Sequence, residues 1–285
     1  MKIVSIIALL LISMLVISCT QGNKQIADFK KEGIGEVDVS RQESYFPRTA
    51  HQGDTFDMGL ALINNAAYDA KDVRVVVAGF DNAFVDLIHE KEEKALIAGR
   101  SLFDQDGEEA QFQFQGVVND LLGAEFKNQN YFIYLTYNSK MEFTPKPCIG
   151  LRQIYKNIQD QGCSIPEGAT RYNGQGAPLT VESMEILPPS ASGGEIKFIL
   201  TLRNRGKGNI NTVQLDKAMI ANKELHCQFR GEPEMTKTVI FPEMKTLEVV
   251  CTALLETENR YTTTLFISFL YDYERVIQQS LELKR

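Results

Sequence analysis

The fold of this chain is decided by the stretch GDTFDMGLALINN, residues Gly53–Asn65. From Phe56 to Leu62 every second residue is a large apolar one, and the residues between them are small or polar. A period of two is typical of a β-strand with one face in a protein core. The paired asparagines then indicate a turn. A second strand is predicted after the turn, because valines alternate over 73–77.

The same pattern recurs 140 residues later, in GGEIKFILTLRNRG, residues Gly193–Gly206. Shifting the first stretch by this distance aligns Phe56 with Ile196 and Asn64 with Asn204, without a gap. We interpret this as an internal duplication. A strand that ends in asparagine and is followed by a second aliphatic strand is a common opening of an immunoglobulin-like β-sandwich.

The two halves also end alike, because aromatic residues alternate over 131–137 and again over 264–273. Further strands are predicted at 140–148 and 275–283, so that each half would close with a hairpin. Aromatic side chains at such positions suit cross-strand pairing in a core better than ligand stacking.

In the first half, residues 82–118 depart from the alternation of apolar and polar residues. Residues 83–97 have a weak helical periodicity, 104–109 form an acidic turn, and a strand follows from Ala110. A short helical turn is expected at 119–124. We therefore treat this region as an insertion in the first sandwich.

A stretch rich in glycine and proline, with one expected helical turn at Tyr155–Ile158, joins the two halves. The predicted fold is therefore all-β, with two tandem immunoglobulin-like sandwiches after an N-terminal hydrophobic helix. The expected parts are a signal peptide with lipobox or a membrane anchor (1–19), a polar spacer (20–33), a first sandwich with an insertion (34–147), a cysteine-bounded linker (148–177) and a second sandwich (178–285).

The first part, MKIVSIIALLLISMLVISC, places the rest outside a cytoplasmic membrane. Its apolar run Ile3–Ile17 is shorter than the roughly 20 residues that span a bilayer, and it matches the apolar region of an export signal. The ending Val16-Ile-Ser-Cys19 resembles a lipobox, which predicts lipidation of Cys19. The alternatives are an uncleaved anchor and a plain signal peptide. Each predicts the outer face of the membrane or the cell surface.

Five cysteines are present, and four remain if Cys19 carries lipid. An even number in an exported chain predicts two disulfides. Three connectivities are possible, and proximity favours Cys148–Cys163 with Cys227–Cys251. Zinc, the rival interpretation, requires close cysteine pairs or interleaved histidines, which the sequence lacks.

No catalytic motif is found. Three histidines lie far apart, and the net charge of −7 disfavours nucleic acid as a partner. Asp104, Asp106 and Glu108 are weak candidates for a calcium site, but their order does not match an EF-hand and is more typical of a solvated turn. No cofactor is expected.

The segments Gly174–Val181 and Glu195–Gly208 resemble uncharacterised archaeal cell-surface proteins and lipoproteins with CARDB-like, immunoglobulin-type domains. The resemblance extends loosely over 55–285. It implies a β-sandwich fold and surface display, and it supplies no catalytic or binding residue.

These observations predict a non-catalytic, membrane-tethered interaction module. The membrane would be contacted through the N-terminal anchor or lipid, and the partner would be an envelope protein or polymer. The alternative is a surface lipoprotein that binds a small molecule or carbohydrate for a transporter or enzyme, in a pocket lined by Tyr155, Tyr172 or aromatic residues of the insertion.

Overall fold

The computed structural model describes residues 31–41, 47–150, 163–189, 194–241, 246–255 and 260–285, all within the unit Lys31–Arg285. The predicted signal segment with Cys19, most of the spacer and the expected turn at Tyr155 lie outside these residues. Every regular element that the structure describes is a strand, so the fold is all-β, as predicted. In the described ranges no helix is long and apolar enough to span a membrane.

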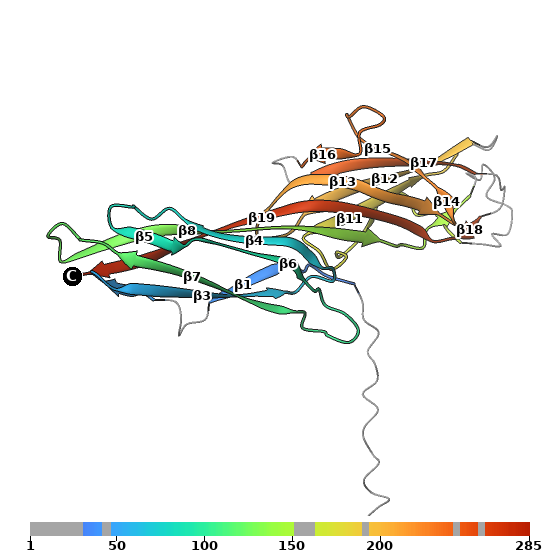
Figure 1. Ribbon diagram of the computed structural model, residues 1–285. Helices are drawn as coiled ribbons and strands as arrows, with labels where there is room; N and C mark the ends of the chain where they lie inside the picture. Colours follow the sequence, from blue (N-terminus) through green and yellow to red (C-terminus); the bar gives the residue numbers. More distant parts are fainter. Residues whose placement is uncertain (1–30, 42–46, 151–162, 190–193, 242–245, 256–259) are drawn as a thin grey trace, which may run out of the picture. The chain divides into compact units, whose positions relative to one another are not determined.

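Figure 1 labels most of the strands. In chain order they are β1 (Val37–Arg41), β2 (Thr49–His51), β3 (Thr55–Asn64), β4 (Ala70–Ala78), β5 (Val85–His89), β6 (Lys91–Ile97), β7 (Glu109–Val118), β8 (Phe126–Phe143), β9 (Cys148–Ile149), β10 (Thr170–Arg171), β11 (Leu179–Leu187), β12 (Gly194–Asn204), β13 (Asn209–Ile220), β14 (Lys223–Glu224), β15 (His226–Phe229), β16 (Thr238–Ile240), β17 (Thr246–Leu255), β18 (Tyr261–Thr262) and β19 (Leu265–Lys284).

The two halves of the chain repeat one strand order. In the first half, one sheet has the order β1-β3-β7-β5, and in the second half the matching strands follow as β11-β12-β17-β15 with β10 added outside β11. Eight further strands form one sheet, in which β8-β4-β6 of the first half corresponds to β19-β13-β16 of the second, and β9 and β18 pair as a separate two-stranded sheet. This correspondence agrees with the internal duplication that the sequence indicates.

Strands β8 and β19 join the two halves (Figure 1). They pair antiparallel without interruption, from Phe143 opposite Ile267 to Phe126 opposite Lys284. Each strand would be an edge of its own half, and mutual pairing satisfies both edges. Because strands of both predicted domains share one sheet, the domain boundaries stay a prediction.

The long ladder corrects one prediction, that each half closes with a hairpin. Residues 140–143 continue β8, and 275–283 continue β19. The physical reason is that the alternation never breaks: Tyr137, Ser139, Met141 and Phe143 are all buried, and no glycine or proline interrupts them.

The helical interpretation of residues 83–97 is also wrong. These residues form β5, which pairs with β7, and β6, which pairs with β4. Both strands are short and carry charged residues, so their own periodicity is weak. Their strand conformation is fixed by the strands they pair with. Residues 119–124 hold a turn at Leu122–Gly123 and no helical turn.

The deciding stretches form β3 and β12 and fill the core. The alternating apolar side chains from Phe56 to Leu62 and from Ile196 to Leu202 are buried. Phe56 contacts Phe80, which stacks on Tyr131 of β8 at 4.5 Å between ring centroids. The four-stranded sheet and the first-half strands of the eight-stranded sheet therefore pack through their buried faces.

The repeated asparagines have one structural role. Asn64 accepts a hydrogen bond from the backbone nitrogen of Ala66 and donates to the backbone oxygen of Tyr68, both at 3.0 Å. Asn204 accepts from Gly206 at 3.0 Å and donates to Gly208 at 2.9 Å, with the same spacing along the chain. Each asparagine thus holds the turn between two sheets.

Two disulfides cross-link the described chain. Cys148 pairs with Cys163, and Cys227 pairs with Cys251, which lies directly opposite it in the β15–β17 ladder. Such cross-links persist in oxidising, extracytoplasmic compartments.

Candidate functional site

The centre of the eight-stranded sheet is opened by two bulges. In the order β13-β19-β8-β4, the register of β4 shifts between Lys71 and Arg74, and that of β13 shifts between Ile210 and Val213. Both shifts lie beside the same part of the β8–β19 ladder, where Asn138 pairs with Asp272. A bulge bends its strand and disrupts the ladder locally, so two bulges at one level create room between the strands.

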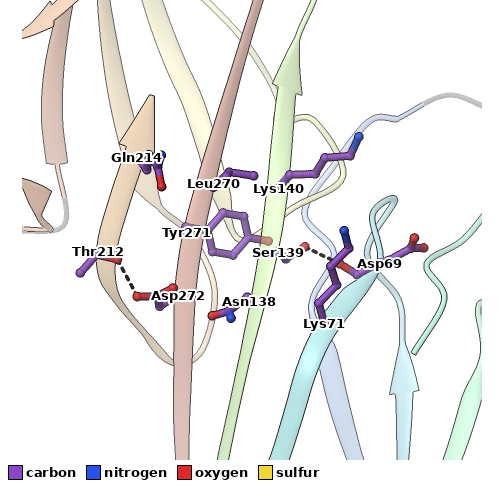
Figure 2. Close-up of a pocket in the computed structure, with 10 residues that line it drawn as sticks. All are labelled: Asp69, Lys71, Asn138, Ser139, Lys140, Thr212, Gln214, Leu270, Tyr271 and Asp272. Atoms are coloured by element: carbon purple, nitrogen blue, oxygen red, sulfur yellow. Dashed lines mark hydrogen bonds between the residues drawn. The ribbon is translucent and has the colours of Figure 1, made fainter. Parts of the chain in front are cut away.

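A cavity of about 420 Å³ lies at this position, and we call it the central pocket (Figure 2). Its walls come from β13, β19, β8 and β4 and from the residue before β4. The lining residues are Asp69, Lys71, Asn138, Ser139, Lys140, Thr212, Gln214, Leu270, Tyr271 and Asp272. Both halves of the duplication therefore contribute to one pocket.

The pleat of β8 and β19 divides these residues between two faces. Asn138, Lys140 and Asp272 are exposed on the outer face, whereas Ser139 and Tyr271 are buried on the core side. Figure 2 shows the Tyr271 ring between the two long strands, with its hydroxyl directed toward Ser139. Burial raises the pKa of Tyr271, so this hydroxyl stays protonated.

Several polar groups of the pocket are held in place by neighbours. Asp272 accepts a 2.6 Å hydrogen bond from Thr212, and the Ser139 hydroxyl donates to the backbone oxygen of Asp69 at 2.9 Å. Asn138 donates to the carboxylate of Asp72 at 3.1 Å. Asp72 has a positive φ of 51°, so this contact supports the bulged backbone of β4.

Two polar side chains of the central pocket remain available. Within the described residues, Lys71 and Gln214 make no side-chain hydrogen bond or ion pair. The amide oxygen of Asn138 and one carboxylate oxygen of Asp272 are likewise free of described contacts. The pocket thus offers both donors and acceptors to a ligand.

A second cavity of about 500 Å³ adjoins the central pocket, since Asn138 and Asp272 line both. It continues past the bulges toward Arg74 and Glu93 on one side and Asn211 on the other. We call the two cavities together the central groove.

A buried charge cluster supports the groove from the core side. Tyr273, which lines the second cavity, donates a short hydrogen bond to Glu36 and accepts one of 2.6 Å from the backbone nitrogen of Gly208. Glu36 is only 5% exposed and receives a backbone hydrogen bond from Lys207 at 3.0 Å. Arg275 lies 3.6 Å from Glu36. This cluster ties the segment before β1 to the β12–β13 turn of the second half.

Asp38 extends the cluster toward solvent. Its carboxylate contacts Lys207 at 2.6 Å and Arg275 at 3.2 Å, and Asn65 donates to it at 3.1 Å. Burial alone would raise the pKa of Asp38, but these donors outweigh burial and hold the pKa below its ordinary value. The hydrogen bond to Asp38 in turn raises the pKa of Lys207. Asp38 and Lys207 are therefore both charged at neutral pH, and the cluster acts as a structural clamp.

A separate cavity of about 650 Å³ contains Tyr172, one of the two tyrosines named for the alternative function. The Tyr172 ring meets Phe143 edge to face, at 4.7 Å between centroids. Glu142 lines the same cavity and is engaged by Lys31 and Lys140 at 2.7 and 2.8 Å. The other tyrosine, Tyr155, lies outside the described residues.

The structure does not gather the weak calcium candidates into a metal site. Asp104 accepts hydrogen bonds from the backbone of Asp106 and Gly107, and Glu108 is engaged by Lys94 and by the backbone of Ala98. In the described part of the chain, no three histidine, cysteine or acidic side chains are grouped to hold a metal ion. These acidic residues therefore build the turn.

The sequence patterns did not predict the residues of the central groove. Lys71, Asn138, Gln214 and Asp272 belong to no motif and come from four strands, so only the strand order brings them together. The available signal was the duplication itself, which aligns the bulged residues Asp72 and Thr212.

No family model matches the chain, and no curated protein matches it. Solved structures that match include one titled "Complete structure of manganese lipoxygenase of Gaeumannomyces graminis and partial structure of zonadhesin of Komagataella pastoris". This chain is 8% identical to it, the match covers 88% of this chain and 93% of that chain, and the TM-score is 0.10. A likeness at this level carries no argument about fold or function.

Proposed function

We propose that the chain is a membrane-tethered, extracytoplasmic and non-catalytic interaction module. It holds a protein or polymer of the cell envelope on the outer face of the eight-stranded sheet. The observation that carries this proposal is the central groove, which four neighbouring strands of both halves line with available polar groups.

The long ladder and the buried cluster support a binding role. The β8–β19 pairing and the Glu36–Lys207 contacts hold the two groove walls on one hydrogen-bonded framework. A preformed site loses less conformational entropy when it binds, which favours affinity. The groove is therefore suited to recognise a partner without rearrangement.

The location is part of the same proposal. The apolar segment 1–19 with Cys19 supports tethering at the outer face of the membrane, and the two disulfides support an oxidising compartment. The matching strand orders support the finer interpretation that each half is an immunoglobulin-like sandwich of the CARDB-like kind seen in archaeal surface proteins.

The test is site-specific cross-linking in intact cells that carry the full chain. A photoreactive residue in place of Gln214 lies in the groove, and one in place of Gln278 lies on the same sheet outside it. We expect one defined envelope component to be captured from position 214 and not from position 278. Equal capture at both positions, or none at 214, contradicts the proposal.

The second candidate function is a surface lipoprotein that binds a small molecule or carbohydrate for a transporter or enzyme. The cavity at Tyr172 favours it, because an aromatic ring braced by Phe143 offers a stacking surface beside polar groups. Under this function, Tyr172→Ala abolishes retention of the ligand, whereas Gln214→Ala leaves it unchanged. The opposite pattern excludes this cavity.

A further inference from the structure

We infer that the central groove binds an extended polyhydroxylated chain, that is, an oligosaccharide segment of an envelope polymer. The inference rests on the proposed function, because it names the chemical class of the partner. Four features of the groove carry it: the hydrogen-bonding groups in its walls, its balance of charge, its few exposed apolar side chains and its length.

The walls are rich in neutral groups that both donate and accept hydrogen bonds. Amides and hydroxyls are contributed by Thr136, Asn138, Asn211, Thr212 and Gln214. A sugar hydroxyl also donates and accepts, and a side-chain amide offers both functions in one plane. The free oxygen of Asp272 adds a strong acceptor at the point where the two cavities meet.

The charges in the groove cancel. Four cationic side chains, Lys71, Arg74, Lys94 and Lys140, stand against four anionic ones, Asp69, Asp72, Glu93 and Asp272. Such a balance gives no net attraction for a polyanion such as nucleic acid, nor for a polycation. It favours a partner that is polar and carries little net charge.

The central groove has few exposed apolar side chains that could hold a partner. Leu270, 37% exposed, is the one large apolar side chain of the central pocket that is exposed. Protein partners are usually held by buried aromatic or aliphatic anchors at the centre of the contact. The groove offers little for such an anchor, and this favours a glycan over a protein.

The groove is elongated. Each cavity crosses the strands from β13 to β4, which at a strand spacing near 4.8 Å is about 14 Å, and the two cavities follow one another along the strands, the first beside Lys140 and the second beside Thr136 of β8. The two adjoining cavities share only Asn138 and Asp272, so one occupant that fills both must be a chain and not a compact molecule. An oligosaccharide lying along the strands, over β8 and β19, satisfies this shape.

The test uses the purified full chain and isothermal titration calorimetry. The probes are cellohexaose, the N-acetylglucosamine hexamer and the galacturonic acid hexamer, which differ in their substituents and charge. We expect at least one neutral probe to bind. Gln214→Ala and Lys71→Ala, at opposite walls of the groove, should each weaken that binding by about tenfold, the factor for one lost hydrogen-bonding partner.

Gln278→Ala is the matched control, because it removes an exposed amide from β19 outside the groove. It should leave the affinity unchanged, and circular dichroism should show all three variants folded like the parent. Binding that the two groove variants do not weaken overturns the inference. Capture of a protein from position 214, with no probe bound at millimolar concentration, also overturns it and leaves the proposed function standing.

Discussion

Replacing Tyr273 with phenylalanine removes one hydroxyl that two buried groups share. The hydroxyl donates to the Glu36 carboxylate and accepts from the backbone nitrogen of Gly208 at 2.6 Å. Tyr273 is 1% exposed and Glu36 is 5% exposed, so water cannot replace either contact without a rearrangement. Burial, with Glu36 as the next cause, raises the pKa of Tyr273, which keeps the phenol a donor at any physiological pH.

The expected loss of stability follows from these two contacts. A hydrogen bond to a charged group contributes about 1.5–3 kcal/mol, and a buried unsatisfied donor costs about 1–3 kcal/mol. Lys207 and Arg275 still neutralise Glu36 in the variant, which favours the lower end of both ranges. We therefore expect Tyr273→Phe to lower the free energy of unfolding by about 2.5 kcal/mol. For a chain of this size, that corresponds to a fall in Tm of about 5–10 °C.

The matched control is Tyr271→Phe, two residues earlier on the same strand. Its hydroxyl is also buried, but it has no hydrogen bond of normal geometry among the described residues. We expect this variant to lose less than about 1 kcal/mol. Urea unfolding followed by circular dichroism measures both variants against the parent. Equal losses, or a loss below about 0.5 kcal/mol for Tyr273→Phe, refute the clamp.

Three further predictions concern pH and the cysteines. Hydrogen bonds from basic neighbours outweigh burial and hold the pKa of Asp38 and Glu142 below their ordinary values of 3.8 and 4.5. Their contribution to stability is therefore complete above those values and is lost as pH falls through the folded-state pKa. We expect Tm to fall in acid. The Asp38→Asn variant should show a smaller fall in Tm over the same pH range. Mass spectrometry of non-reduced peptides should show Cys148 linked to Cys163 and Cys227 linked to Cys251, and a crossed pairing would exclude this connectivity. Replacing both Cys227 and Cys251 with alanine should lower the free energy of unfolding by about 3 kcal/mol. Metabolic lipid labelling should fail in a Cys19→Ser variant, and persistent label would exclude the lipobox interpretation.

The all-β class and the repeat could be predicted because both depend on local alternation. In β3 and β12 the buried positions are the large apolar ones, and each asparagine after them closes a turn with its own side chain. Information of this kind lies within a dozen neighbouring residues. The sequence pattern therefore identified these strands and their repeat.

What could not be predicted depends on pairing between distant strands. Residues Phe126–Phe143 alternate without a break, but nothing in that pattern says that β19 is the partner. The short charged strand β6 has no strong pattern of its own and is fixed by pairing with β4. The groove shares this origin, since its residues converge only after β13, β19, β8 and β4 are side by side.

Strands β8 and β19 act as one framework for both halves. Native-state hydrogen exchange measures this directly, in the paired central segments 131–141 and 269–279. We predict that their amides exchange only through global unfolding, with the same free energy in both strands. Exchange of these amides through a local opening, while the amides of β3 and β12 stay protected, would contradict the shared framework.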